Sequence, residues 1–235
     1  VEGFKYAEIN DMKSVKNVFS KKTIAVILEL IQGEGGVLVA DEKFVKELEI
    51  FCKKNDLIFI IDEIQTGMGR TGKFFGYEHY DIKPDVVTLA KALGGGLPLG
   101  ACIIKDKYAN VLTYGAHGST FGGNMVACSA GIAVIEQIDK KLLNHISKTG
   151  EYFFEKLNAL KSKYKIIKQV RGKGLMLGVE FYEDISDMVL EGLKHGFIIN
   201  VVQNNVLRFL PNYFIEKKNI DKLIVFLDEI LKKNM

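Results

Sequence analysis

The sequence lacks any apolar run approaching the ~20 residues that a membrane-spanning helix needs. An excess of one charge is also missing, because 32 Lys and Arg side chains stand against 29 Asp and Glu, for a formal net charge of +3. This balance argues against a nucleic-acid or membrane-surface protein, which would concentrate basic side chains in a patch. A hydrophobic content of 48% excludes a disordered or fibrous chain, and 235 residues suffice for one large domain or two small ones.

Cysteine is scarce, and Cys52, Cys102 and Cys128 show no CxxC spacing. Their odd number and scatter predict reduced thiols in a cytoplasmic protein, with neither a disulfide framework nor a metal site. The first residues, Val1 to Gly3, show no sign of a secretory signal peptide, which agrees with a cytoplasmic location.

Arginine is rare as well, since only Arg70, Arg171 and Arg208 occur among the 32 basic residues. Each is therefore a candidate for a place that needs a planar, bidentate cation, with chance placement as the alternative. Arg208 lies in an apolar stretch and needs a carboxylate partner if it is buried. Glu34, Glu29 or a substrate carboxylate could supply that partner.

Apolar runs predict an α/β fold with a largely parallel sheet in the first part of the chain. After residue 138 the pattern changes to a long amphipathic helix over 140–163, followed by strands mixed with helices. We therefore predict a large domain over residues 1–138 and a smaller α+β domain over residues 139–235. The expected strands are 23–28, 57–61, 86–90, 99–104, 166–170, 175–181, 197–200 and 206–210, and the other expected helices are 41–55, 125–138, 185–195 and 216–232.

The glycine-rich stretch 67–73 matches GxGxxG and almost matches GxxxxGK, two nucleotide-binding patterns. Neither pattern fits its surroundings, because the stretch does not follow a strand directly and does not open a periodic helix. Phe74 also stands where the second pattern needs a magnesium-binding hydroxyl. The glycines are better explained by a tight loop.

Asp62 stands at the end of the expected strand 57–61, and α/β proteins bind ligands at that edge of the sheet. A strand-end cap is the alternative for Asp62 alone. Ile64 and Gln65 follow it, however, and the three side chains together could bind one flat heterocycle. The Asp62 carboxylate could pair with a ring N–H⁺, Ile64 could cover a face of the ring, and the Gln65 amide could reach a ring oxygen.

Lys91 follows the strand 86–90 and precedes small, apolar and glycine residues. Such surroundings predict a partly desolvated amine that can act as a nucleophile, with a surface-loop lysine as the alternative. The loop 115–124 is rich in glycine and hydroxyl groups and precedes a predicted helix, so it suits an anion such as phosphate, although alone it is weak evidence.

Taken together and in order, these segments resemble the class-III aminotransferases that use pyridoxal 5'-phosphate (PLP). Within that family the sequence is most similar to acetylornithine aminotransferases. The resemblance implies a fold-type-I PLP-dependent transferase, with part of its large domain and a small C-terminal domain. The motifs that carry the resemblance are 29–36, 62–72, 84–91, 117–124, 171–176 and 208–211.

The resemblance also implies roles for single residues. Lys91 would be the catalytic residue that carries the cofactor on its amine. Asp62 would face the pyridine nitrogen, Gln65 the phenolic oxygen and Ile64 the ring, with Glu63 also among the cofactor-binding residues.

The remaining roles concern the phosphate and the substrates. Thr120 would contact the cofactor phosphate of the neighbouring subunit, which implies a homodimer with shared active sites. Ser119 would lie near the substrate. Arg208 would bind the α-carboxylate of the amino acceptor, and Glu34 would pair with Arg208 while the diamine is bound.

The activity that the resemblance implies is transfer of the terminal amine of N-acetylornithine, or a related ω-amine, to 2-oxoglutarate in arginine biosynthesis. The kinetics would be ping-pong. The alternatives are an ornithine, succinyl-diaminopimelate or 4-aminobutyrate aminotransferase, an aminomutase, or a non-catalytic relative that binds cofactor.

The sequence departs from the family pattern in two ways. Leu30, Met125 and Asn212 stand where the family usually has proline, which affects loop stiffness more than chemistry. Family members also carry a substantial N-terminal portion, so we expect this chain to be a fragment that is inactive alone.

Overall fold

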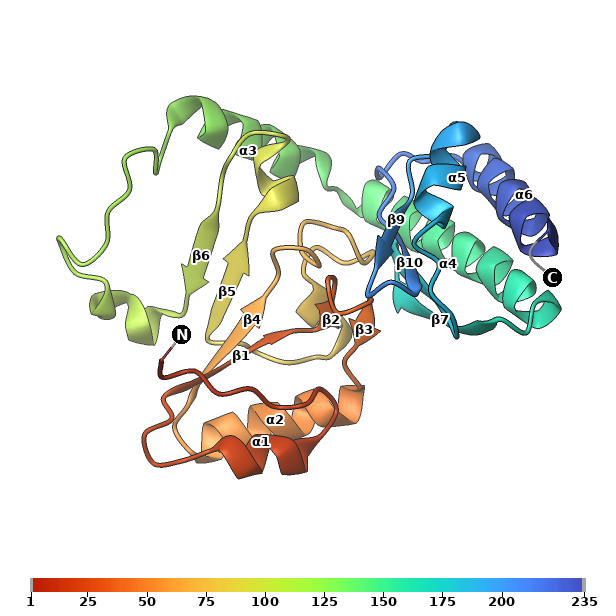
Figure 1. The fold of residues 1–235 in the computed structure, drawn as a ribbon. Helices are drawn as coiled ribbons and strands as arrows, with labels where there is room; N and C mark the ends of the chain where they lie inside the picture. The colour runs from red at the N-terminus through yellow and green to blue at the C-terminus, as the bar shows by residue number, and fades with distance from the viewer. Residues whose placement is uncertain (1, 234–235) are drawn as a thin grey trace. The chain divides into compact units, whose positions relative to one another are not determined.

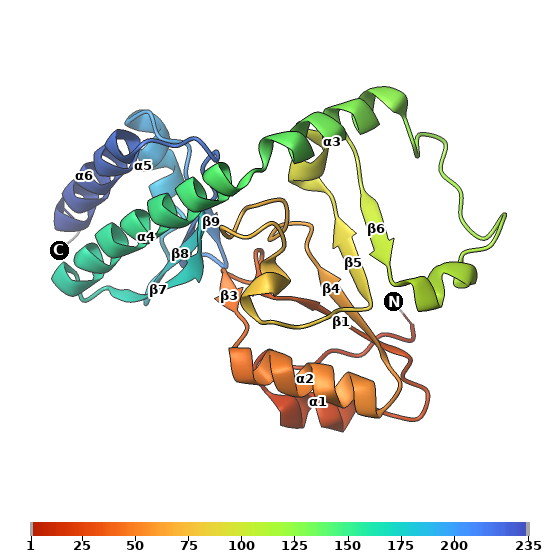
Figure 2. The same cartoon turned by 180° about the vertical axis from the view of Figure 1, so that it is seen from behind.

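The computed structural model describes residues 2–233 and divides the chain into two compact units. The N-terminal unit contains the chain up to Leu30, together with Ala40–Met68 and Phe75–Gln137. The C-terminal unit contains Ile31–Val39, Gly69–Phe74 and the chain from Ile138. Each unit has its own sheet and its own helices (Figures 1 and 2).

The N-terminal unit is built on a four-stranded sheet in the order β1-β4-β5-β6. The first three strands are parallel, and β6 runs antiparallel to β5. The strands coincide with short apolar runs, as expected for a largely parallel sheet. Their bounds are Ala25–Glu29 for β1, Ile58–Asp62 for β4, Val86–Leu89 for β5 and Ala101–Ile104 for β6.

Helix α2, Glu42–Lys54, covers one face of this sheet. Its buried side chains, which include Val45 and Leu48, form one hydrophobic cluster with Phe59 and Ile61 of β4. A short helix that the sequence analysis missed, α1 (Met12–Val18), lies beside α2 (Figure 1). The third helix, α3 (Met125–Gln137), packs against the short 3₁₀ helix η2 (Lys91–Gly94). Two further 3₁₀ helices, η1 (Gly76–His79) and η3 (Asp106–Val111), complete the unit.

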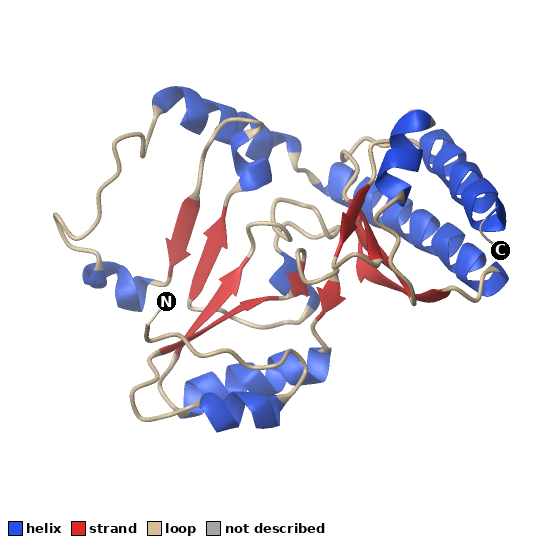
Figure 3. Cartoon of the chain, viewed as in Figure 1, coloured by secondary structure: helices blue, strands red, loops and turns tan. Residues whose placement is uncertain are grey.

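The C-terminal unit has an antiparallel sheet in the order β7-β8-β10-β9. Helices α4 and α6 lie beside each other and share a core with this sheet (Figure 3), around side chains such as Phe153, Leu177 and Phe226. A small hairpin of β2 (Ile31–Gln32) and β3 (Leu38–Val39) also belongs to the unit. The other bounds are α4 Lys140–Lys163, β7 Ile167–Lys173, β8 Met176–Phe181, α5 Met188–Lys194, β9 Asn200–Val202, β10 Val206–Phe209 and α6 Lys217–Lys233.

One predicted strand was placed wrongly. The sequence suggested a strand over 197–200, but β9 runs from Asn200 to Val202. Phe197 stacks on Phe226 of α6 with ring centroids 4.8 Å apart, and Ile199 lies close to Gly192 of α5. The apolar run therefore reflects packing onto helices and not a place in the sheet.

None of the helices between residues 2 and 233 is both long enough and apolar enough to cross a membrane.

Candidate functional site

The carboxyl edge of the parallel sheet brings polar side chains from three strands into one row. Glu29 of β1 is in register with Asp62 of β4, and Asp62 is in register with Thr88 of β5. Register partners project from the same face of a sheet, so these three side chains share a face. Lys91 begins the segment directly after β5. This is the edge at which α/β sheets bind ligands.

The Asp62 carboxylate takes part in the turn that follows β4. Its Oδ1 accepts a hydrogen bond of 2.9 Å from the backbone N–H of Ile64. The strand-end cap that the sequence offered as an alternative is therefore present. This hydrogen bond occupies Oδ1 and leaves Oδ2 available for another hydrogen-bond partner.

Glu63 turns its carboxylate into the protein and is only 1% exposed. Its oxygens accept hydrogen bonds from the Thr66 hydroxyl at 2.5 Å, from Gly76 N at 2.9 Å and from Tyr77 N at 2.8 Å. Burial raises the pKa of Glu63 above its ordinary value, against the effect of these three hydrogen bonds. In the described residues Glu63 thus ties the turn after β4 to the segment at Gly76 and Tyr77.

Two buried oxygens in this region have no hydrogen-bond partner within residues 2–233. They are Oε1 of Gln65 and Oγ1 of Thr88. A buried polar atom without a partner costs about 1–3 kcal/mol and calls for a ligand or an ordered water. Sequence analysis singled out Gln65 and missed Thr88, whose only signal is a hydroxyl in an otherwise apolar strand end.

Lys91 has an unusual backbone conformation, with φ of +46° in the left-handed region. That conformation costs a non-glycine residue about 1–3 kcal/mol and is typical of functional sites. Lys91 lines an open cavity of about 550 Å³ together with Ala90 and the segment Gly96–Gly100. Its side chain is exposed, so within the described residues the expectation of a partly desolvated lysine was wrong.

Ser119 and Thr120 lie in the loop between η3 and α3, and both are exposed. Ser119 Oγ accepts a hydrogen bond of 3.0 Å from Gly122 N, which shapes the loop locally. Asn124 caps α3 by accepting from Val126 N and Ala127 N, at 3.1 Å each. Figures 1 and 2 show this loop extending away from the strands of the N-terminal unit.

Arg208 and Glu34 form an ion pair within the C-terminal unit. Arg208 Nη1 lies 2.6 Å from Glu34 Oε1, and Arg208 Nε donates to Asn200 Oδ1 at 3.1 Å. Of the two protein carboxylates that the sequence left open, Glu34 is the one that pairs with Arg208. The Arg208 side chain is 11% exposed and that of Glu34 is 78% exposed. Because the carboxylate is well solvated, it can leave at small cost and free the guanidinium for another carboxylate.

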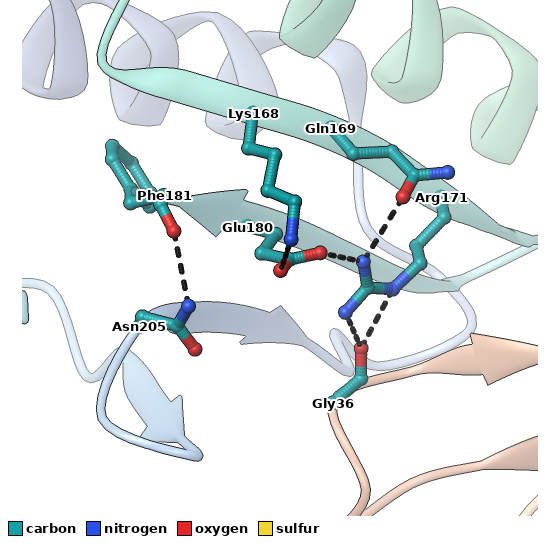
Figure 4. A network of polar contacts seen from close by, with 7 residues as sticks. All are labelled: Gly36, Lys168, Gln169, Arg171, Glu180, Phe181 and Asn205. Carbon is teal, nitrogen blue, oxygen red and sulfur yellow. Dashed lines mark hydrogen bonds and ion pairs between the residues drawn. The ribbon is translucent and has the colours of Figure 1, made fainter. Parts of the chain in front are cut away.

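The other two arginines bind backbone carbonyl groups in the C-terminal unit. Arg70 Nη1 donates to Leu175 O at 3.1 Å and to Pro211 O at 2.6 Å, and its guanidinium lies over the Tyr213 ring. Burial lowers the pKa of Arg70 below its ordinary value. Arg171 donates through Nε and Nη2 to Gly36 O, at 2.9 Å and 2.7 Å (Figure 4). Planar, multidentate contacts of this kind are what the rarity of arginine predicted.

A family model described as aminotransferase class-III matches residues 4–231 of this chain. The acetylornithine aminotransferase of Aquifex aeolicus is 49% identical over 231 residues, which cover 98% of this chain and 60% of that protein. The acetylornithine aminotransferase of Caldanaerobacter subterraneus subsp. tengcongensis is 48% identical over 233 residues, which cover 98% of this chain and 59% of that protein.

Among solved structures, an ornithine aminotransferase from Toxoplasma gondii is similar, with a TM-score of 0.91 and 30% identity. The match covers 98% of this chain and 56% of that one, whose reported active site is partly occupied by PLP. The chain thus spans less than two thirds of the length of each of these relatives.

Proposed function

Because the chain belongs to the class-III aminotransferase family, we propose that it is part of an enzyme that transfers the terminal amine of N-acetylornithine, or a related ω-amine, to 2-oxoglutarate. This reaction would serve arginine biosynthesis. One observation of the structure carries the proposal. Asp62 and Thr88 are in register at the carboxyl ends of β4 and β5, Gln65 follows β4 and Lys91 follows β5, and the buried oxygens of Gln65 and Thr88 have no hydrogen-bond partner within residues 2–233. The relatives named acetylornithine aminotransferase favour this substrate.

The residues at this edge fit PLP as the cofactor. Asp62 Oδ2 is available to a ring N–H⁺, the buried Oε1 of Gln65 needs a partner, and Ile64 offers an apolar contact. Lys91 supplies the amine on an exposed segment after β5. When bound, PLP withdraws electrons and stabilises the negative charge that forms at the substrate carbon.

The protein's own groups then perform two tasks. Asp62 keeps a proton on the ring nitrogen, because a carboxylate favours a cation beside it. The Nζ of Lys91 would hold the cofactor, and the same amine would be placed to move a proton to and from the substrate carbon.

Arg208 serves the substrate carboxylate in this scheme. While an ω-amine donor is bound, Glu34 covers the guanidinium through the 2.6 Å pair. When the 2-oxo acid enters, its carboxylate takes the place of the exposed Glu34 side chain. Arg208 thus pairs with Glu34 in one half-reaction and with the carboxylate of the 2-oxo acid in the other. Ser119 would lie near the substrate.

We also propose a homodimer with shared active sites, in which Thr120 reaches the cofactor phosphate bound to the neighbouring chain. The exposed loop before α3 supports it, because large apolar side chains there need cover. Phe121 in the loop is 81% exposed, and Met125 at the start of α3 is 84% exposed. A heterodimer of Lys91→Ala and Thr120→Ala chains would then contain one intact site and recover about half of the wild-type activity. Verified heterodimers without recovery would contradict shared sites.

The cytoplasm is the proposed location, because Cys52, Cys102 and Cys128 are all free thiols, as a reducing compartment would keep them.

Half-reaction rates of the complete protein with a panel of ω-amines test the substrate. N-acetylornithine should react faster than ornithine, succinyl-diaminopimelate and 4-aminobutyrate, and a reversed order would replace the proposed donor. Turnover in the absence of a 2-oxo acid would indicate an aminomutase. Cofactor binding without any half-reaction would indicate a non-catalytic relative.

A further inference from the structure

The turn that carries Glu34 has a backbone that its residues do not favour. It joins β2 to β3, and Val37 within it has φ of +58° while being completely buried. A β-branched residue in the left-handed region is a strong outlier, and such strain persists only where the surroundings impose it. Val37 packs against Gly178 of β8, where an added Cβ would lie 2.9 Å from the Val37 Cβ.

Arg171 of β7 is one of the groups that impose this shape. Its Nε and Nη2 converge on a single acceptor, Gly36 O, two residues after Glu34 (Figure 4). The Arg171 side chain is 10% exposed, so both hydrogen bonds are shielded from water. Gln203 adds a second restraint, because its Nε2 donates to the backbone carbonyl of Glu34 at 2.9 Å.

Glu180 of β8 orients Arg171 from the other side. Its carboxylate pairs with Arg171 Nη1 and, at 2.7 Å, with Lys168 Nζ (Figure 4). Burial favours the neutral acid, but hydrogen bonds from Lys168 and Arg171 outweigh it and hold the pKa of Glu180 below its ordinary value. Glu180 is therefore ionised at neutral pH and locks the guanidinium in place.

We propose that Arg171 is a positioning residue that holds Glu34 against Arg208 and so sets how readily Arg208 accepts a substrate carboxylate. The inference rests on the proposed function, in which Arg208 binds that carboxylate. Glu34 competes with the substrate for one guanidinium, and its competitive strength depends on how firmly the turn presents it. With Arg171 in place the pair is preformed. Without it, Glu34 samples more conformations and competes less well.

The test compares variants of the complete, cofactor-loaded protein. Arg171→Lys keeps the charge beside Glu180 but loses the double donation to Gly36 O. Glu180→Gln is a second way to loosen Arg171 if the lysine variant does not fold. Lys168→Met is the matched control, since Lys168 also pairs with Glu180 but has no hydrogen bond to the turn within residues 2–233.

Two quantities are measured for each variant. The first is hydrogen exchange of the peptide that covers residues 33–39. The second is the Kd for glutarate, a dicarboxylate that cannot react. Arg171→Lys should speed the exchange about tenfold and tighten glutarate binding about three- to tenfold, whereas Lys168→Met should change neither. In a Glu34→Gln background the effect of Arg171→Lys on glutarate should disappear, because the competitor is already lost.

The other outcomes overturn the idea. Unchanged exchange in Arg171→Lys means that Arg171 does not restrain the turn. An equal change in glutarate affinity in the wild-type and Glu34→Gln backgrounds means that Arg171 does not act through Glu34. If glutarate does not bind the wild-type protein, or binds Arg208→Lys equally well, the proposed role of Arg208 fails. In that case hydrogen exchange of the peptide 33–39 alone tests whether Arg171 positions the turn. Faster exchange in Arg171→Lys would support this role, and unchanged exchange would reject it.

Discussion

Two shielded carboxylates, Glu63 of the N-terminal unit and Glu180 of the C-terminal unit, have contrasting partners. Among residues 2–233, Glu63 accepts hydrogen bonds from neutral donors alone, namely one hydroxyl and two backbone N–H groups. In the C-terminal unit Glu180 meets two cations, Arg171 and Lys168. The pKa of Glu63 is raised by burial, whereas that of Glu180 is lowered because its cations outweigh burial. Burial alone therefore does not decide the charge of a carboxylate, because cationic partners can outweigh it, as they do at Glu180.

The same contrast extends to the candidate site residues. Asp62 and Gln65 of the N-terminal unit leave oxygen atoms to a further partner, whereas Arg208 and Glu34 of the C-terminal unit already complement each other. If both sets bind ligands, as proposed above, the first would use open acceptor atoms and the second would first have to break an ion pair.

The largest expected effect follows from replacing the carboxylate at the sheet edge. Asp62→Asn keeps an oxygen for the Ile64 N–H, so the turn should survive, but it loses the charge that holds a ring proton. We expect turnover to fall on the order of hundred- to thousandfold, about 3–4 kcal/mol in the barrier, with cofactor still bound. Single-turnover rates check this, and near-normal rates would refute the role of Asp62.

The contrasting carboxylates predict opposite pH dependence of stability. Glu180 has a lowered pKa, so the stability it contributes is present above its ordinary value of 4.5 and is lost as pH falls through the lowered folded value. Glu63 has a raised pKa, so its contribution is present below 4.5 and is lost as pH rises through the raised folded value.

Denaturant midpoints measured against pH check both signs. The difference in free energy of unfolding between wild type and Glu180→Gln should become smaller as pH falls. The corresponding difference between wild type and Glu63→Gln should become smaller as pH rises. Parallel pH profiles for the two variants would contradict the assignment of opposite pKa directions.

The smallest expected effect compares two aspartates at helix N-termini, one in each unit. Asp139 accepts from Leu142 N at 2.7 Å and caps α4, whereas Asp41 occupies the N-cap of α2 without a side-chain cap bond. Asp139→Ala should cost about 1 kcal/mol of stability, and Asp41→Ala only a few tenths. Thermal melts of the two variants measure the loss of stability. Equal losses would mean that the side-chain hydrogen bond of Asp139 adds nothing to the stability that an aspartate gives at this position.

Much of the fold could be predicted because long or strongly patterned segments carry their own signal. The strands β1, β4 and β5 are apolar runs, and helix α4 shows a sustained amphipathic period that matches its observed bounds. The hairpin β2–β3 escaped prediction because strands of two residues have no measurable period.

The candidate site was less accessible from sequence because its contacts are long-range. Arg208 and Glu34 are separated by 174 positions, so the sequence left three partners open. The inward direction of the Glu63 side chain depends on burial and register, which a local pattern does not encode. The same holds for the Thr88 hydroxyl, which is buried and has no hydrogen-bond partner within residues 2–233. Arg171 drew attention through its rarity and as part of the motif 171–176, and only the structure shows which carbonyl it binds.

The most direct test of the whole account is to locate the lysine that carries the cofactor. The complete protein is loaded with PLP, reduced with borohydride to fix the cofactor on its amine, and digested for peptide mapping. The pyridoxyl mass should appear on the peptide containing Lys91 and should be absent from that peptide in a Lys91→Arg variant. Label found only on another lysine would contradict the account.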